Sequence, residues 1–175
     1  QLSYTPPPGF RGNQQFSYTV EDARGGIAEA TVTVRVSSPP VAGADNALAQ
    51  EDTPLEIAVL NNDNDPEMDS LAILTVGQPA NGVTRASSET SIIYTPNSGF
   101  VGTDQFFYTI SDGNLNTATG TVSVVVNGQP DLLDDHVYTA VNTTLTIPVL
   151  ANDTDPDGDA LTVVSIQTPP SGTAT

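Results

Sequence analysis

Two short acidic stretches have the residue types and spacing that could bind a metal ion. One runs from Asn62 to Asp69 and the other from Asn152 to Asp159. In the second stretch the aspartates stand on alternate positions, as Asp153, Asp155, Asp157 and Asp159. A proline and a glycine bend the chain between them, so these carboxylates are expected to converge. Such a set of hard oxygen ligands suits Ca²⁺, which takes about six to eight oxygens.

The first stretch repeats the pattern with one difference. Its acidic residues are Asp63, Asp65, Glu67 and Asp69, and Met68 stands where the second stretch has Gly158. Glycine eases a sharp bend, so this substitution weakens the prediction for the first stretch. The alternative for both stretches is a solvated acidic turn without an ion, because Asp, Asn, Gly and Pro are ordinary turn residues.

Other chemistries find little support in the residues. An EF-hand would need an acid at the twelfth loop position, and counting from Asp153 that position is Val164. The single histidine, His136, lies among acids and is more simply a bystander than a base. No nucleophile elbow occurs, and paired carboxylates in glycosidases sit in deep clefts that small sandwiches rarely offer. We therefore predict that the chain is not an enzyme.

The composition restricts the partners. The 175 residues include 21 acids and four basic residues, all arginine, which gives a formal charge of -17. This charge excludes nucleic acid and anionic membrane surfaces as partners. No apolar run is long enough to insert into a membrane in this segment. The absence of cysteine is compatible with an extracellular bacterial protein that has no disulfides. Because the chain begins in mid-pattern, we expect it to be a window of a longer polypeptide.

The chain is a tandem repeat. Three segments recur at one offset of 90 residues without insertions: Tyr4–Gly12 as Tyr94–Gly102, Phe16–Val20 as Phe106–Ile110, and Val59–Asp63 as Val149–Asp153. A period of this length is typical of a small β-sandwich.

Alternation of apolar and polar residues predicts strands throughout, for example in Thr31–Val36 and Leu145–Val149. In the complete repeat the predicted strands are 45–50, 53–60, 71–78, 82–86, 91–95, 105–111 and 117–126. Seven short strands in about 90 residues indicate an all-β fold of tandem immunoglobulin-like Greek-key sandwiches. Phe106, Tyr108 and Ile110 are expected in the core, with Phe107 on the opposite face.

The repeat divides the chain into three parts. Residues 1–38 are the second half of one repeat, 39–128 form a complete repeat, and 129–175 are the first half of a third. The two halves are complementary, so self-association through half-repeats, within or between chains, is one expectation. Two permuted domains, 1–85 and 91–175, are the alternative.

The loops after the second and sixth strands of such a sandwich emerge at one end, together with the start of the first strand. Asp45 and Asp112 are therefore expected beside the first acidic loop, and Asp135 beside the second. This end faces the preceding repeat. We predict that calcium bound there orders the junction between neighbouring repeats and stiffens the chain.

Three linked motifs resemble one family. The motifs Val-Leu-x-Asn-Asp-x-Asp-Pro, Tyr-Thr-Pro-x-x-Gly-Phe-x-Gly and Phe-x-Tyr-Thr-Ile-Ser-Asp-Gly look like the bacterial cadherin-like, or VCBS-type, immunoglobulin-like repeats of large RTX-type adhesins. The resemblance implies a calcium-binding extender module of a bacterial cell-surface or secreted protein, used in adhesion, biofilm or surface filaments. The family's calcium ligands would map onto the acidic loop residues and, less directly, onto Asp45, Asp112 and Asp135.

Two other functions remain open at this point. One is a module that binds carbohydrate or protein, for which exposed aromatics are the usual signal. The chain has no Trp and only Phe107 as an outward-facing candidate. The other is a structural subunit of an extracellular filament whose split repeats are completed between chains.

Overall fold

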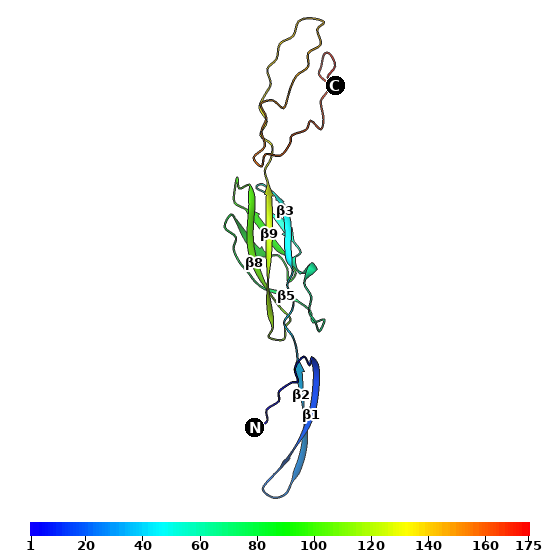
Figure 1. Cartoon of the computed structure of the whole chain (residues 1–175), viewed down its shortest axis with the longest axis vertical. Coiled ribbons are helices and arrows are strands. Elements are labelled where there is room, and N and C mark those ends of the chain that lie inside the picture. The colour runs from blue at the N-terminus through cyan, green and yellow to red at the C-terminus, as the bar shows by residue number, and fades with distance from the viewer.

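The computed structural model describes all residues from 1 to 175 and shows three segments arranged end to end (Figure 1). An N-terminal hairpin is followed by a complete sandwich and then by a C-terminal segment that contains turns but no strands. No helix of the length and apolar character needed to cross a membrane is present in the described chain. The prediction of an all-β fold is confirmed.

The hairpin consists of β1 (Gly12–Glu21) and β2 (Ile27–Val36), which pair antiparallel along their whole length. The turn between them is held by Asp22, whose Oδ1 accepts hydrogen bonds from the backbone N–H groups of Arg24 and Gly26, both at 2.8 Å. These bonds, from Gly26 and then Arg24, hold the pKa of the Asp22 carboxyl below its ordinary value. The same turn recurs after the sixth strand of the complete sandwich, where its aspartate belongs to the candidate site.

The sandwich has two sheets. The strands are β3 (Ala44–Gln50), β4 (Leu55–Ile57), β5 (Ala72–Val76), β6 (Gly82–Ala86), β7 (Ile92–Pro96), β8 (Gly102–Ser111) and β9 (Thr117–Asn127). One sheet has the order β3-β9-β8-β5 and the other β4-β7-β6. The first strand, β3, pairs parallel with the last, β9, whereas the other pairs are antiparallel. Each of the seven strands predicted for the complete repeat therefore exists, with shifted ends.

The core lies between the two sheets. Phe106, Tyr108 and Ile110 of β8 are at most 1% exposed, whereas Phe107 is 54% exposed, as the alternation predicts. Across the core, Tyr94 of β7 stacks on Phe106 with ring centroids 6.2 Å apart. Aliphatic side chains from β9 and the segment around β4 complete the cluster. The apolar alternation of β8 and β9 thus fixes which face of their sheet packs into the core.

One predicted strand ends early. The expected strand 53–60 stops at Ile57, and a 3₁₀ turn, η1 (Val59–Asn62), follows it. Val59 is completely buried within this turn, so it continues the apolar pattern without continuing the strand. The turn redirects the chain into the first acidic loop.

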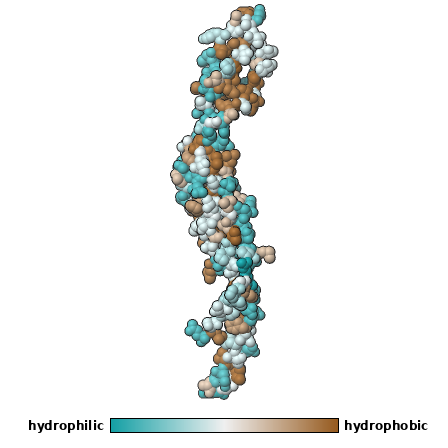
Figure 2. Space-filling model, viewed as in Figure 1, coloured by the Kyte–Doolittle hydropathy of each residue, from teal (hydrophilic) through white to brown (hydrophobic).

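The strand expected at Leu145–Val149 is not formed, which corrects that prediction. Its counterpart β4 is paired only with β7, and the structure places no equivalent partner residues beside this segment. Without them, the apolar side chains of this segment remain on the surface, which Figure 2 shows as brown patches on the uppermost segment. Apolar side chains elsewhere in the C-terminal segment are exposed as well, among them Leu132, Leu133 and Val164, at 69%, 64% and 93% exposure.

Candidate metal centres

The first acidic loop is organised around one buried carboxylate. Asp65 is 8% exposed, and its Oδ1 accepts hydrogen bonds from the backbone N–H groups of Glu67 at 2.9 Å and Asp69 at 3.1 Å. These bonds pull the loop into a tight turn. The loop is tied to the strand region by the bridge between Val41 and Asn64. The local sequence therefore forms a compact turn with acidic side chains on it.

The second acidic loop has the same conformation. Asp155 Oδ1 accepts from the N–H groups of Asp157 at 2.9 Å and Asp159 at 3.1 Å, and the corresponding bridge joins Asp131 and Thr154. Residues 90 positions apart therefore make the same hydrogen bonds, so the two loops repeat in structure as well as in sequence.

Methionine does not prevent the bend of the first loop. Met68 has φ = 61° and Gly158 has φ = 78°, so both residues adopt the left-handed conformation. A non-glycine residue pays about 1 kcal/mol for this conformation. The Met68 side chain is 92% exposed and meets no steric obstacle. The concern that Met68 would disfavour the first loop is therefore not supported by its conformation.

The first loop brings three carboxylates together. Oxygens of Asp65, Asp69 and Asp112 lie within 4.8 Å of one another. Asp112 comes from the turn after β8, so two loops far apart in the sequence meet here, as the sandwich topology predicts. The Oδ2 atom of Asp65 is buried and has no hydrogen-bond partner. A buried, unpartnered oxygen on a carboxylate of this group is suited to bind a cation.

Asp112 is held in its charged form by its own turn. Burial by itself would raise the pKa of the Asp112 carboxyl, but hydrogen bonds from the Asn116 side chain and from the backbone of Asn114 and Asn116 outweigh it. The pKa of Asp112 consequently lies below its ordinary value. The residue therefore contributes a negative charge to the site at neutral pH.

The second loop gathers its three carboxylates locally. Oxygens of Asp155, Asp157 and Asp159 also lie within 4.8 Å of one another, with Asp155 half-buried and the other two exposed. Asp157 Oδ2 accepts a hydrogen bond of 2.6 Å from the N–H of Gly128, the residue that follows β9. This site therefore spans the boundary between the complete sandwich and the C-terminal segment.

The comparison with known proteins establishes the family. The model of the bacterial Ig domain matches residues 1–35, 37–125 and 127–175, which together are nearly the whole chain. The chain belongs to the bacterial Ig domain family. The resemblance to bacterial immunoglobulin-like repeats is thus confirmed at the level of this family. Bacterial Ig domains are commonly surface or extracellular modules and are typically non-catalytic.

Similar solved structures include two endo-fucoidan hydrolases of glycoside hydrolase family 107. MfFcnA4 is 20% identical with a TM-score of 0.39, over 71% of this chain and 20% of that one. MfFcnA9 is 19% identical with a TM-score of 0.36, over 70% and 23%.

A third similar structure is a nucleoside hydrolase-related hypothetical protein from Saccharophagus degradans, 16% identical with a TM-score of 0.38, over 54% of this chain and 26% of that one. The Ig-domain chain therefore spans about a fifth to a quarter of these larger proteins. At such TM-scores the likeness carries no argument about function. The search of curated proteins finds no match.

Five predicted ligands lie outside the two groups of three. They are Asp45, Asp63, Glu67, Asp135 and Asp153. Glu67 is engaged across the junction, where it accepts hydrogen bonds from the backbone N–H of Ser38 at 2.9 Å and from its hydroxyl at 3.2 Å.

Asp45 and Asp63 form a separate inner pair within the complete Ig domain. Asp63 accepts hydrogen bonds from the Tyr108 hydroxyl at 3.0 Å and from the N–H of Gly43 at 2.7 Å. Burial, together with the nearby charge of Asp63, raises the pKa of the Asp45 carboxyl, and Asp45 Oδ2 is buried without a partner. Burial and the two carboxylates also raise the pKa of the Tyr108 hydroxyl. The pair anchors the domain entrance to the core rather than completing the three-carboxylate group.

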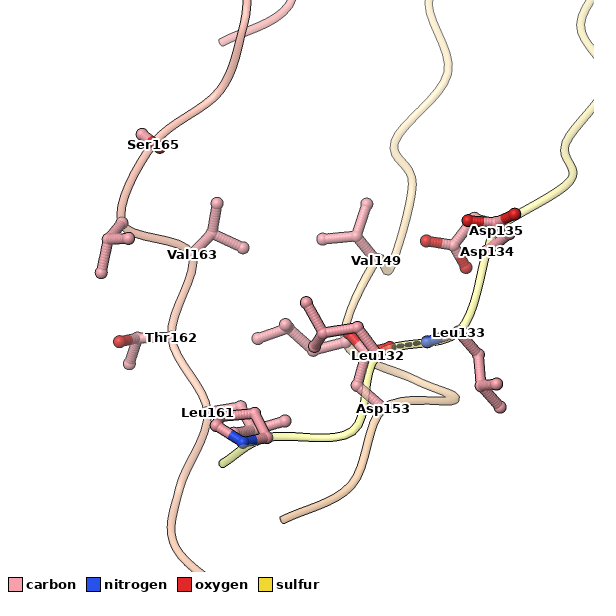
Figure 3. Close-up of a pocket in the computed structure, with 13 residues that line it drawn as sticks. Leu132, Leu133, Asp134, Asp135, Val149, Asp153, Leu161, Thr162, Val163 and Ser165 are labelled. Carbon is pink, nitrogen blue, oxygen red and sulfur yellow. Dashed lines mark hydrogen bonds between the residues drawn. The ribbon is translucent and has the colours of Figure 1, made fainter. Parts of the chain in front are cut away.

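Asp135 and Asp153 belong to the C-terminal segment, where they line a hollow of about 500 Å³ (Figure 3). Asp153 accepts a hydrogen bond of 2.9 Å from the N–H of Leu133, which repeats the contact between Asp63 and Gly43. Figure 3 shows Asp135 beside Asp134, across the hollow from Leu161 and Val163. Aliphatic side chains equivalent to core residues line the rest, so the hollow corresponds to the core of the half-repeat.

Asp104 has a structural role that the sequence analysis did not assign. It is 5% exposed and accepts hydrogen bonds from the N–H of Asn81 at 2.9 Å and from the Tyr94 hydroxyl at 3.1 Å. It therefore fixes the loop before β6 to the start of β8. The only signal in the sequence was the difference from Gln14 at the equivalent position.

Proposed function

We propose that this chain is a non-catalytic, calcium-stabilised spacer of a bacterial surface or secreted adhesin, in which calcium in the acidic loops stiffens the junctions between Ig domains. The observation that carries the proposal is Asp65, a carboxylate 8% exposed whose Oδ2 has no hydrogen-bond partner and which brings an oxygen within 4.8 Å of oxygens of Asp69 and Asp112.

The energetics favour a cation at such a group. Two unit charges at about 4 Å repel by about 1 kcal/mol in water and by more where water is excluded. A buried carboxylate oxygen without a partner adds an unfavourable desolvation term. A divalent ion reverses the sign of these terms, and Ca²⁺ accepts the irregular oxygen geometry that loops provide.

The location of both groups connects the ion to stiffness. At the first junction, the Ser37 hydroxyl of the linker donates to Asp112 Oδ2 at 3.2 Å. At the second, Gly128 donates to Asp157. An ion that orders these carboxylates would also order the linker bonded to them, and so limit the angles between neighbouring domains.

Small-angle X-ray scattering of the 175-residue chain tests the proposal. We expect the maximum dimension to be largest in calcium and to decrease in chelator, because unneutralised loops release the linkers. Extracellular modules bind calcium with Kd values of about 10⁻⁴–10⁻³ M, so the change should be half complete in that range.

The matched control is the double variant Asp65→Asn with Asp155→Asn, which should keep one dimension in both conditions. A wild-type chain whose scattering is the same with calcium and with chelator would contradict the proposed role.

A further inference from the structure

The first junction, between the N-terminal hairpin and the complete domain, contains two basic side chains. Of the four arginines in the chain, Arg11 lies 3.4 Å from Glu67 and Arg35 forms an ion pair with Asp69. Both arginines belong to the preceding hairpin region, and both acids belong to the acidic loop of the complete domain. The side chains of Glu67 and Asp69 are only 10% and 15% exposed, whereas those of Arg11 and Arg35 are 55% and 46% exposed, so the carboxylates are shielded and the guanidinium groups reach them from the solvent side.

The second junction, between the complete domain and the C-terminal segment, has no basic residues at the equivalent positions. At the offset of 90 residues, Arg11 corresponds to Val101 and Arg35 to Val125. A side chain on Gly128 would meet Val101 and Pro156 at 3.1 and 3.0 Å, which places Val101 at this junction. Valine packs there but supplies no charge.

The backbone contact across the two junctions is nevertheless the same. Ser38 N–H donates to Glu67 Oε2 at 2.9 Å, and the equivalent Gly128 N–H donates to Asp157 Oδ2 at 2.6 Å. The junctions therefore share one geometry and differ in what neutralises the acids. In the first, two guanidinium groups offset two carboxylates, and Asn114 also donates to Asp69 at 2.9 Å. In the second, the structure records no ion pair to Asp155, Asp157 or Asp159.

We propose that the first junction is closed by the arginines of the preceding repeat without a metal ion, whereas the second closes only when calcium is bound. The second half of this inference rests on the proposed function, and the first half restricts the calcium-dependent stiffening of that function to the second junction. The consequence is a chain in which the first junction is always stiff and the second junction loosens when the calcium concentration decreases. Calcium can still occupy the free oxygen of Asp65, but the first junction does not depend on it.

Ser38 and Gly128 provide matched reporters, because their amide protons make the equivalent bond in the two junctions. Exchange of these protons with water, measured by NMR on the full 175-residue chain, reports how often each junction opens. In chelator, we expect the Ser38 amide to exchange about tenfold more slowly, relative to its unfolded-chain rate, than the Gly128 amide. Calcium should slow the exchange of the Gly128 amide to a similar rate and should change the exchange rate of the Ser38 amide little.

Substituting each residue by the one at the equivalent position of the other junction should reverse the calcium dependence of the two junctions. Arg35→Val should make protection of Ser38 depend on calcium, and Val125→Arg should protect Gly128 in chelator. Arg35→Lys, which keeps the charge, should retain part of the protection. Arg85→Val is the matched control, because Arg85 is exposed on β6 and forms no ion pair with the acids of either junction.

The two proposals fail in different ways. Equal exchange at Ser38 and Gly128 in chelator, or full protection of Ser38 in the Arg35→Val chain without calcium, would overturn the inference about arginine. If the Ser38 amide is protected in chelator but the exchange rate of the Gly128 amide is the same with and without calcium, the proposed calcium function at the second junction would instead be overturned.

Discussion

Replacing Asp65 with asparagine is expected to change stability in opposite directions in chelator and in calcium. Asp65→Asn keeps an oxygen that accepts the backbone bonds of the loop, but it removes the charge on a buried group whose Oδ2 has no partner. Without metal, the variant should be more stable by about 1 kcal/mol, because an uncompensated buried charge is costly. In calcium at about a hundredfold excess over Kd, the variant should lose up to about 2.7 kcal/mol of ligand stabilisation.

Thermal melting followed by circular dichroism measures this reversal. A change of about 1 kcal/mol corresponds to about 4–8 °C for a domain of this size. Glu29→Gln is the matched control, since it removes one negative charge from an exposed residue of β2 near the Asp22 turn of the N-terminal hairpin, at the opposite end of that hairpin from the acidic loop. Its effect should be small and alike in both conditions. A change of the same sign and size for Asp65→Asn in calcium and in chelator would show that no ion uses this carboxylate.

Truncating Phe106 should nearly unfold the complete domain. Phe106 is 1% exposed and stacks on Tyr94 between the two sheets, so Phe106→Ala leaves a cavity in the only complete core. We expect a loss of about 3–5 kcal/mol in the free energy of unfolding. Urea denaturation of the whole chain measures it.

The neighbouring residue provides the control for this prediction. Phe107 is 54% exposed on the outer face of the same strand, so Phe107→Ala should change stability by no more than about 0.5 kcal/mol. Similar losses for the two variants would mean that the alternation of β8 does not place the core as described.

The sequence predicts the fold well where its signals are local or repeated. The alternation of β8 identifies Phe106 as buried and Phe107 as exposed because a strand has a period of two. The offset of 90 residues predicts that the two acidic loops have one geometry. The meeting of Asp112 with Asp65 follows from the order of strands in an immunoglobulin-like sandwich, which brings their loops to one end.

The sequence predicts less where pairing across elements decides the outcome. Val59 keeps the apolar alternation, yet it lies in a 3₁₀ turn, because burial alone does not distinguish a strand from a turn that points inward. The expected strand at Leu145–Val149 lacks the partner that its counterpart β4 has in β7.

The ion pairs of Arg11 and Arg35 depend on how two neighbouring repeats pack against each other. A local sequence pattern does not predict that packing. Their presence in only one of the two junctions becomes visible when the structure is combined with the repeat offset. The sequence predicts Asp63 as a ligand because it stands in the acidic stretch, and Asp45 because it shares that end of the sandwich. The hydrogen bond from the Tyr108 hydroxyl draws Asp63 toward the core instead.

The most direct test of the calcium claim is a crystal structure of the chain grown in excess calcium, with anomalous scattering to identify the ion. We predict calcium at both acidic loops, about 2.3–2.6 Å from oxygens that include Asp65 Oδ2 at the first loop and the three aspartates of the second. Well-ordered carboxylates at Asp155, Asp157 and Asp159 that surround only water, in crystals rich in calcium, would contradict it.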